Sequence, residues 1–179
     1  MLRAGGRLAS RPAPPQACLE KDQLFRTSDI AVAVDGACVR VTSAAGLAYH
    51  GSTSAGDGRL EEFFAAYDAA FVLPNEKEGL AGFAACLALN EGCQYDRLCQ
   101  RYGPFREFIV TVRAAGEMVG GLNFVSFPLF DPDQDRPALS LNLNYIFVLG
   151  THRRRGLLTR MVGDLPAVAL AMFARGHAP

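Results

Sequence analysis

Residues 139–160, LSLNLNYIFVLGTHRRRGLLTR, decide how the rest of this chain is interpreted. An alternating strand pattern runs into a short turn, and a helical pattern then begins with the three arginines Arg153, Arg154 and Arg155. The first turn of a helix carries partial positive charge and unpaired N–H groups, so cations there are unfavourable unless an anion is also bound. The arginines therefore predict a phosphate-binding turn at the helix start.

The strand before this turn alternates strictly over eleven residues, which predicts one buried face. The second face changes from polar to aliphatic along its length, as suits a groove that holds a polar acceptor beside an apolar arm. An ordinary strand whose polar face meets water would show the same alternation. The first set is Leu139, Leu141, Leu143, Tyr145, Phe147 and Leu149, and the second is Ser140, Asn142, Asn144, Ile146 and Val148.

The turn resembles motif A of the GNAT superfamily of acyl-CoA-dependent N-acyltransferases, a strand followed by Gln/Arg-x-x-Gly-x-Gly/Ala at a helix start. Arg153 and Gly156 match the motif, whereas Leu158 stands where Gly or Ala is usual and Gly150 where many members have proline. The resemblance covers residues from about 58 onward. It implies an α/β fold of the α+β kind, in which helices flank a mixed, largely antiparallel sheet.

The resemblance also implies the chemistry, which is direct transfer of an acetyl or other acyl group from coenzyme A to a primary amine. The motif strand would pair with the pantetheine arm and supply an N–H group to the oxyanion. The turn and helix start would bind the pyrophosphate. The residues that would bind acetyl-CoA are Ile146, Phe147, Val148, Arg153, Arg154, Arg155, Gly156, Leu157, Leu158 and Thr159.

The catalytic base is less clearly marked. Some family members place a glutamate four residues before the oxyanion position, but Asn142 stands there, and an amide cannot accept a proton at neutral pH. Asn142 and Asn144 are predicted to orient a water, although Glu117 or a residue of the 71–78 loop could act instead, and both asparagines could be plain surface residues. A non-catalytic CoA-binding or regulatory module with a degenerate fold is the alternative function.

The family fold continues with further strands and a helix, including a tyrosine acid, that would follow Pro179. The C-terminal strands are therefore expected to be missing, and an incomplete chain, completion by a partner or a degenerate domain would each explain this. The motif strand becomes an exposed sheet edge, which would invite pairing into a homo-oligomer.

Other patterns predict the elements before the motif strand. Two hairpins are expected, with turns at Asp35-Gly36 and near Gly116. Helical spacing follows Arg59, and a second helical pattern begins at Pro74-Asn75. The predicted elements are a hairpin over 30–42, a loop over 44–58, helices over 59–71, 75–90 and 95–101, a hairpin over 107–127 and a polar loop over 128–137.

Composition limits the classes of function. Among 179 residues, 18 basic and 18 acidic side chains balance, which disfavours a dedicated nucleic-acid binder. The most apolar segment, 165–173, is too short to span a membrane. Five cysteines without a Cys-x-x-Cys pair predict no metal site and a reducing cytoplasmic location. We expect one domain over 21–179 after a disordered tail, 1–20, for which an organellar targeting peptide is the alternative.

Overall fold

The computed structural model describes residues 30–35, 38–73, 75, 77–131 and 136–175. Its centre is a six-stranded sheet whose strands follow the order β1-β2-β3-β4-β5-β6, and every described pairing is antiparallel. The fold is therefore α+β, as predicted. The strands are β1 (Ile30–Asp35), β2 (Cys38–Ser43), β3 (Leu47–Ser52), β4 (Arg106–Ala114), β5 (Glu117–Asp131) and β6 (Arg136–Val148).

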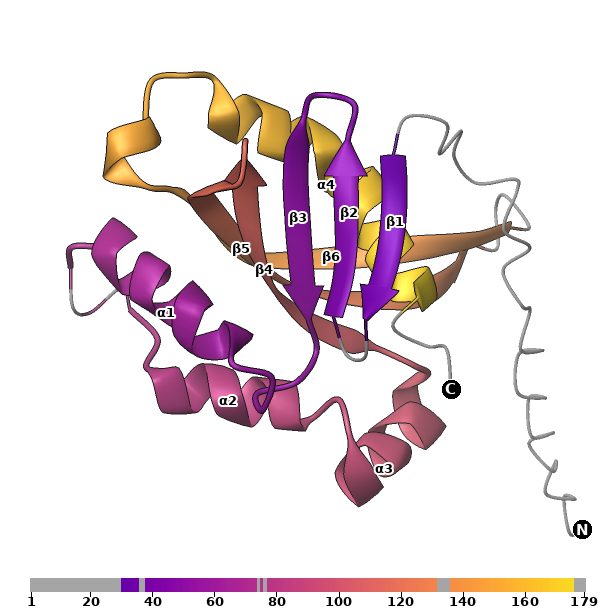
Figure 1. Ribbon diagram of the computed structural model, residues 1–179. Helices are drawn as coiled ribbons and strands as arrows, with labels where there is room; N and C mark the ends of the chain where they lie inside the picture. Colours follow the sequence, from indigo (N-terminus) through magenta and orange to yellow (C-terminus); the bar gives the residue numbers. More distant parts are fainter. Residues whose placement is uncertain (1–29, 36–37, 74, 76, 132–135, 176–179) are drawn as a thin grey trace, which may run out of the picture.

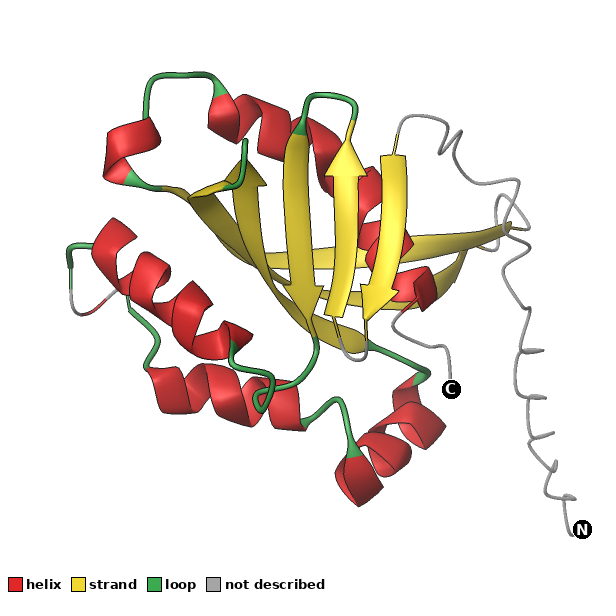
Figure 2. Ribbon diagram, viewed as in Figure 1, coloured by secondary structure: helices red, strands yellow, loops and turns green. Residues whose placement is uncertain are grey.

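Helices cover both faces of the sheet (Figure 1; Figure 2). Helices α1 (Arg59–Ala70) and α2 (Leu80–Ala88) lie on one face, and α3 (Gly92–Tyr102) leads back into β4. Helix α4 (Leu157–Arg175) crosses the opposite face. Each face has its own buried cluster, because successive side chains of a strand point to opposite sides. Phe108 and Val110 pack on the α4 side, while Ile109 packs with α1 and α2.

Most predicted elements are confirmed, but both predicted loops are wrong in part. The segment 44–58 contains β3, in which Leu47 and Tyr49 are buried. Gly51, in the same strand, leaves room for α4, since a Cβ there would lie 2.6 Å from Met172 Sδ. The segment 128–137 belongs largely to long extensions of β5 and β6.

The second predicted helix also starts later than expected, at Leu80 instead of Asn75. Some predictions lie outside the described residues. These are the tail 1–20, the hairpin turn at Gly36, and positions 132–135 of the polar loop.

The expectation of a single buried face on β6 is wrong, because the strand contains a β-bulge. Leu143 pairs with Phe124 and Tyr145 with Asn123, so Asn144 has no partner of its own. An extra residue in one strand shifts every later side chain to the other face. Leu139 and Leu141 accordingly pack on the α4 side, and Tyr145, Phe147 and Leu149 on the α1 side.

Within the described residues, α4 is the one helix long and apolar enough to cross a membrane, with a mean hydropathy of 1.5 over its best window. This corrects the expectation that no segment would reach that length. In this structure 39% of that window is buried: Met161, Val168 and Met172 pack fully buried against the sheet, whereas Leu158 and Val162 are exposed.

Candidate functional site

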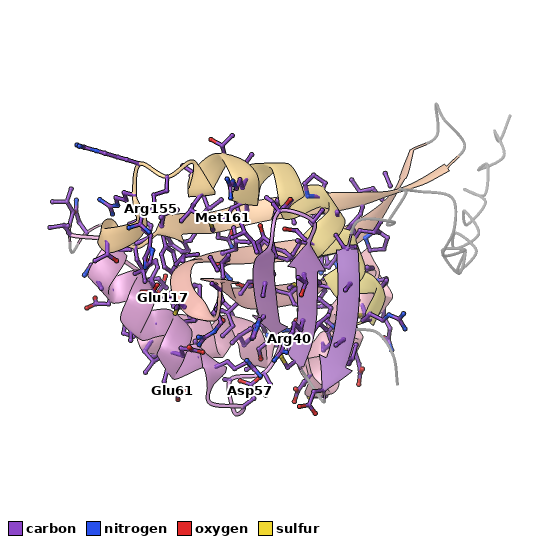
Figure 3. All side chains as sticks on the ribbon, turned by 45° about the horizontal axis from the view of Figure 1, so that its top comes forward. Arg40, Asp57, Glu61, Glu117, Arg155 and Met161 are labelled. Carbon is purple, nitrogen blue, oxygen red and sulfur yellow. The ribbon has the colours of Figure 1, made fainter. Side chains whose placement is uncertain are left out.

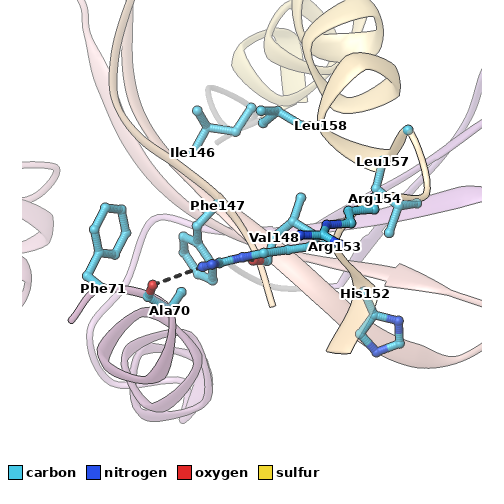
Figure 4. Close-up of a pocket in the computed structure, with 11 residues that line it drawn as sticks. Ala70, Phe71, Ile146, Phe147, Val148, His152, Arg153, Arg154, Leu157 and Leu158 are labelled. Carbon is cyan, nitrogen blue, oxygen red and sulfur yellow. Dashed lines mark hydrogen bonds between the residues drawn. The ribbon is translucent and has the colours of Figure 1, made fainter. Parts of the chain in front are cut away.

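A cavity of about 340 Å³ opens where the end of β6 meets the turn before α4 and the last residues of α1 (Figure 4). Two parts of the chain that are distant in sequence form its walls, the end of α1 and the continuous stretch from β6 into α4, and packing of α1 against β6 brings them together. The lining residues are Ala70, Phe71, Ile146, Phe147, Val148, His152, Arg153, Arg154, Gly156, Leu157 and Leu158.

One wall of the cavity is the free edge of β6, which is the last strand of the sheet. Leu149 N–H bonds to the Val119 carbonyl at 2.9 Å, on the β5 side. Residues of an antiparallel strand direct their N–H and C=O groups alternately to one side and the other. The backbone groups of Ile146 and Val148 therefore point away from β5, toward the open edge. The predicted bare edge is confirmed within the described part of the chain.

A second wall is the start of α4. The Arg160 N–H bonds to the Gly156 carbonyl at 3.2 Å, which marks the first helical hydrogen bond. The amides of Leu157, Leu158 and Thr159 precede it and so have no partner within the helix. Such a free first turn is a general anion-binding feature.

The prediction that the helix begins with the arginines is wrong, because Leu157 is the first helical residue. Arg153 follows a short 3-10 turn, η3 (Gly150–His152), and Arg154 and Arg155 stand in the loop after it. Arg154 has a φ of 64°, a left-handed conformation that is costly for a residue with a Cβ. Gly156, at φ 70°, adopts the same region without that cost. The backbone of this turn is thus bent twice to lead from the strand edge into α4.

Arg153 is an exposed residue whose side chain lies across the cavity (Figure 4). Its Nε donates to the Val148 carbonyl at 3.2 Å, and its Nη2 donates to the Ala70 carbonyl at 3.2 Å. Ala70 is the last residue of α1, where carbonyl groups lack helical partners. Arg153 therefore ties the end of α1 to the end of β6.

Some of the other predicted site residues line the cavity and some do not. Arg155 and Thr159 are exposed and do not line the cavity, and Figure 3 shows Arg155 at the turn above the end of the sheet. Asn142 and Asn144 lie farther along β6, also outside the cavity lining. The seven predicted residues Ile146, Phe147, Val148, Arg154, Gly156, Leu157 and Leu158 surround the cavity together with Arg153.

Sequence reasoning missed His152 and Ala70. His152 is 7% exposed, and its Nε2 lies 3.4 Å from Glu117 Oε1 at the start of β5. A single histidine after a strand gives no pattern that could have marked it. Ala70 contributes a backbone carbonyl, which no side-chain pattern reveals.

An aromatic cluster forms the wall beside α1. Tyr145 and Phe71 rings lie 5.8 Å apart, and Tyr67 lies 5.0 Å from Tyr145. The hydrogen bond with Tyr67, aided by burial, raises the pKa of Tyr145 to about 12. The Tyr145 phenol is therefore neutral at physiological pH, and the two rings of this cluster that line the cavity, Phe71 and Phe147, make this wall apolar.

No group of three or more His, Cys, Asp or Glu side chains in the described residues could hold a metal ion. The four cysteines that the structure describes are all free thiols.

No family model matches this chain, and no curated protein matches it. Among solved structures, it is similar to an aminoglycoside acetyltransferase from an uncultured soil metagenomic sample, with 19% identity over 70% of this chain and 72% of the other. The TM-score of 0.33 is too low for this likeness to inform the function.

Proposed function

We propose that the chain is an N-acyltransferase that transfers an acetyl or other acyl group from coenzyme A to a primary amine in a ternary complex. The observation that carries this proposal is the single cavity shared by a free strand edge and a free helix start. An extended amide-containing arm fits the edge formed by Ile146 and Val148. A diphosphate fits the amides of Leu157 and Leu158, with the Arg154 guanidinium beside them.

The proposed reaction follows from this arrangement. The amine nitrogen attacks the thioester carbonyl carbon, a C–N bond forms, and the C–S bond breaks to release the coenzyme A thiol. The outward N–H of Ile146 would stabilise the oxyanion, a contribution of about 3–4 kcal/mol for such donors. The amine must lose a proton before or during attack, and Asn142 and Asn144 would orient a water that receives it.

The Arg153 contacts bear directly on this proposal. Its Nε occupies the Val148 carbonyl, which is one of the edge groups that the pantetheine arm would use. The side chain must turn away as the ligand enters, after which its charge is free to face the diphosphate.

The test compares acetyl-CoA binding in two matched glycine variants. Gly156 and Gly58 have φ values of 70° and 76°, and a Cβ at either would meet nothing within 4 Å. Gly156→Ala and Gly58→Ala should therefore lose similar stability, about 1 kcal/mol each. Only Gly156→Ala would place a methyl group where the diphosphate binds, so only this variant should lose acetyl-CoA affinity by calorimetry. Equal affinity in both variants would contradict the proposed site.

A non-catalytic CoA-binding or regulatory module remains the second candidate, because an amide, Asn142, stands where an ionisable base would be expected. Release of free thiol from acetyl-CoA in the presence of mixed primary amines separates the two functions. Binding without any turnover would favour the module.

We further propose a cytoplasmic protein that acts without a metal, a nucleic acid or a membrane. A thioester is already activated toward amines, so the reaction needs no Lewis acid. The balance of 18 basic and 18 acidic side chains supports the proposal that the protein does not bind nucleic acid. The free edge of β6 would allow a second copy to pair there, but that pairing would compete with the pantetheine arm.

A further inference from the structure

Four polar side chains on the α1 side of the sheet form a continuous hydrogen-bonded chain. Asn123 Nδ2 donates to Glu107 Oε1 at 2.9 Å, and Asn144 Nδ2 donates to Asn123 Oδ1 at 3.0 Å. Asn142 Nδ2 donates to Asn144 Oδ1 at 2.8 Å. The chain starts at a buried carboxyl and ends at an exposed amide on β6.

The orientation of the side-chain amides in this hydrogen-bonded series is set by a backbone carbonyl, which can only accept a hydrogen bond. Asn123 Nδ2 also donates to the Phe108 carbonyl at 3.0 Å, and a backbone carbonyl has no proton to give. Asn123 must therefore turn its Oδ1 toward β6. Each following amide then donates inward and presents its oxygen outward, and the last oxygen is Oδ1 of Asn142.

The anchor of the chain is rigid. Glu107 is 8% exposed and Asn123 is 2% exposed. The backbone of Glu107 is held on both sides by Asn90, which accepts from its N–H and donates to its carbonyl, each at 2.8 Å. The outer end is different, because Asn142 and Asn144 are exposed and no described residue donates to Asn142 Oδ1.

The β-bulge brings the outer amides to this side. Asn142 pairs with Val125, which shares its face with Asn123, and the unpaired Asn144 fits between Leu143 and Tyr145. Without the extra residue, Tyr145 and Phe147 would leave the α1 side. The bulge thus places Asn144 directly before Tyr145 of the aromatic cluster and two residues before Ile146, where the proposed oxyanion site begins.

We infer that Oδ1 of Asn142 is a hydrogen-bond acceptor for the N–H group of a primary alkylamine substrate, with Asn144 and Asn123 as positioning residues that fix its orientation. The inference rests on the proposed function for its chemistry and specifies the class of acceptor. Oδ1 of Asn142, the last oxygen of this series, attracts N–H donors, and the rings of Tyr145 and Phe71 on the same side of the sheet suit the alkyl chain and its positive charge. An acceptor that presents only a carbonyl or carboxylate oxygen at this point would be rejected, because two hydrogen-bond acceptors would then face each other.

The test uses n-butylamine, which is butylammonium at pH 7, as the probe. Titration into ¹⁵N-labelled protein should shift the side-chain Nδ2 resonances of Asn142 and Asn144. Asn144→Leu and Asn123→Ala should each weaken butylammonium binding roughly tenfold, about 1.4 kcal/mol. Because Asn123 acts through Asn144, the double variant should bind no more weakly than either single variant.

Ser126→Ala is the matched control for loss of a buried polar group. Ser126 also lies on β5 and is fully buried, but it packs on the α4 side of the sheet, and it should leave butylammonium affinity unchanged. If Asn123→Ala fails to fold, the exposed substitutions Asn144→Leu and Asn142→Leu decide the question. Unshifted asparagine resonances in the wild-type protein, unchanged affinity in Asn144→Leu, or additive losses in the double variant would each overturn the inference.

The acetyl-CoA affinity of the same samples separates this inference from the proposed function. All variants should bind acetyl-CoA as the wild-type protein does, because none of the substituted residues lines the cavity. If the wild-type protein bound butylammonium at Asn142 but no acetyl-CoA, the amine site would stand and the acyltransferase proposal would fall.

Discussion

Replacing Arg154 by glycine should make the protein more stable and a weaker binder of acetyl-CoA. Arg154 has a φ of 64°, and a left-handed residue with a Cβ costs about 1–2 kcal/mol relative to the right-handed region. Glycine adopts this conformation without strain, but its larger loss of conformational entropy on folding costs about 0.5–1 kcal/mol. The difference between these two ranges is about 0–1.5 kcal/mol, and its midpoint of about 0.8 kcal/mol corresponds to roughly 2–3 °C in Tm for a chain of this length.

The same substitution removes a guanidinium that lines the cavity. A charge-assisted hydrogen bond to phosphate is worth about 1.5–3 kcal/mol, so acetyl-CoA affinity should fall at least tenfold. Left-handed strain at a binding residue is a pattern that functional sites often show, because the surrounding structure holds the side chain where the ligand needs it.

Ala115→Gly provides the matched control. Ala115 has a φ of 50° in the two-residue turn that joins β4 to β5, and it does not line the cavity at the end of β6. It should gain a similar stability without any change in acetyl-CoA affinity. Urea denaturation and calorimetry measure both properties. Lower stability in Arg154→Gly, or equal affinity in the two variants, would refute the reasoning.

Local sequence patterns predicted the elements whose signals are complete within a few residues. The hairpin that joins β4 to β5 has two successive residues of positive φ, Ala115 and Gly116, and a glycine between alternating apolar residues indicates such a turn. Helix α1 was predicted closely, because its buried side chains recur at helical spacing. Strand β3 was missed, since only Leu47 and Tyr49 alternate before two small residues, Gly51 and Ser52.

The acetyl-CoA-binding residues were predicted only along β6 and the turn that follows it, and the 71–78 loop was named only as a source of an alternative catalytic base. The wall formed by Ala70 and Phe71 comes from residues about 80 positions earlier, and no local pattern links them to Arg153. The bulge at Asn144 is also invisible in the alternation, because apolar residues continue at every second position on either side of it. The alternation therefore predicted a single buried face for β6, although the residues before and after the bulge pack on opposite sides of the sheet. The polar chain from Glu107 to Asn142 depends on that bulge and on three strands, so sequence alone could name its last two members but not its origin.

Three further predictions concern stability and can be checked by urea denaturation. Gly120→Ala should destabilise the protein by about 3 kcal/mol or prevent folding, because the new Cβ would lie 2.2 Å from the Phe147 carbonyl oxygen. Gly163→Ala in α4, where a Cβ meets nothing within 4 Å, should stabilise the protein by about 0.5–1 kcal/mol. The opposite order of stabilities would contradict the packing described. Tyr49→Phe should cost about 1–2 kcal/mol, because the fully buried Tyr49 hydroxyl donates to Asp164 Oδ2 at 2.7 Å and so joins β3 to α4; an unchanged free energy of unfolding would show that this bond contributes nothing. Glu107→Gln should alter the pH dependence of stability. Burial raises the pKa of the Glu107 carboxyl above its ordinary value near 4.5, and the hydrogen bond from Asn123 only partly opposes this. The folded protein therefore holds this proton more tightly than the unfolded chain does, so the stabilising contribution is complete below the unfolded pKa and is lost as pH rises through the folded pKa. Relative to Glu107→Gln, the wild-type protein should become less stable from about pH 4.5 upward, with a slope of at most about 1.4 kcal/mol per pH unit. Glu61→Gln, at an exposed carboxyl on α1, is the control for the same chemical change outside the buried site. A difference between Glu107→Gln and the wild-type protein that stays constant with pH would mean that Glu107 is charged as readily in the fold as in the unfolded chain, and the buried anchor of the amide chain would then have to be solvated.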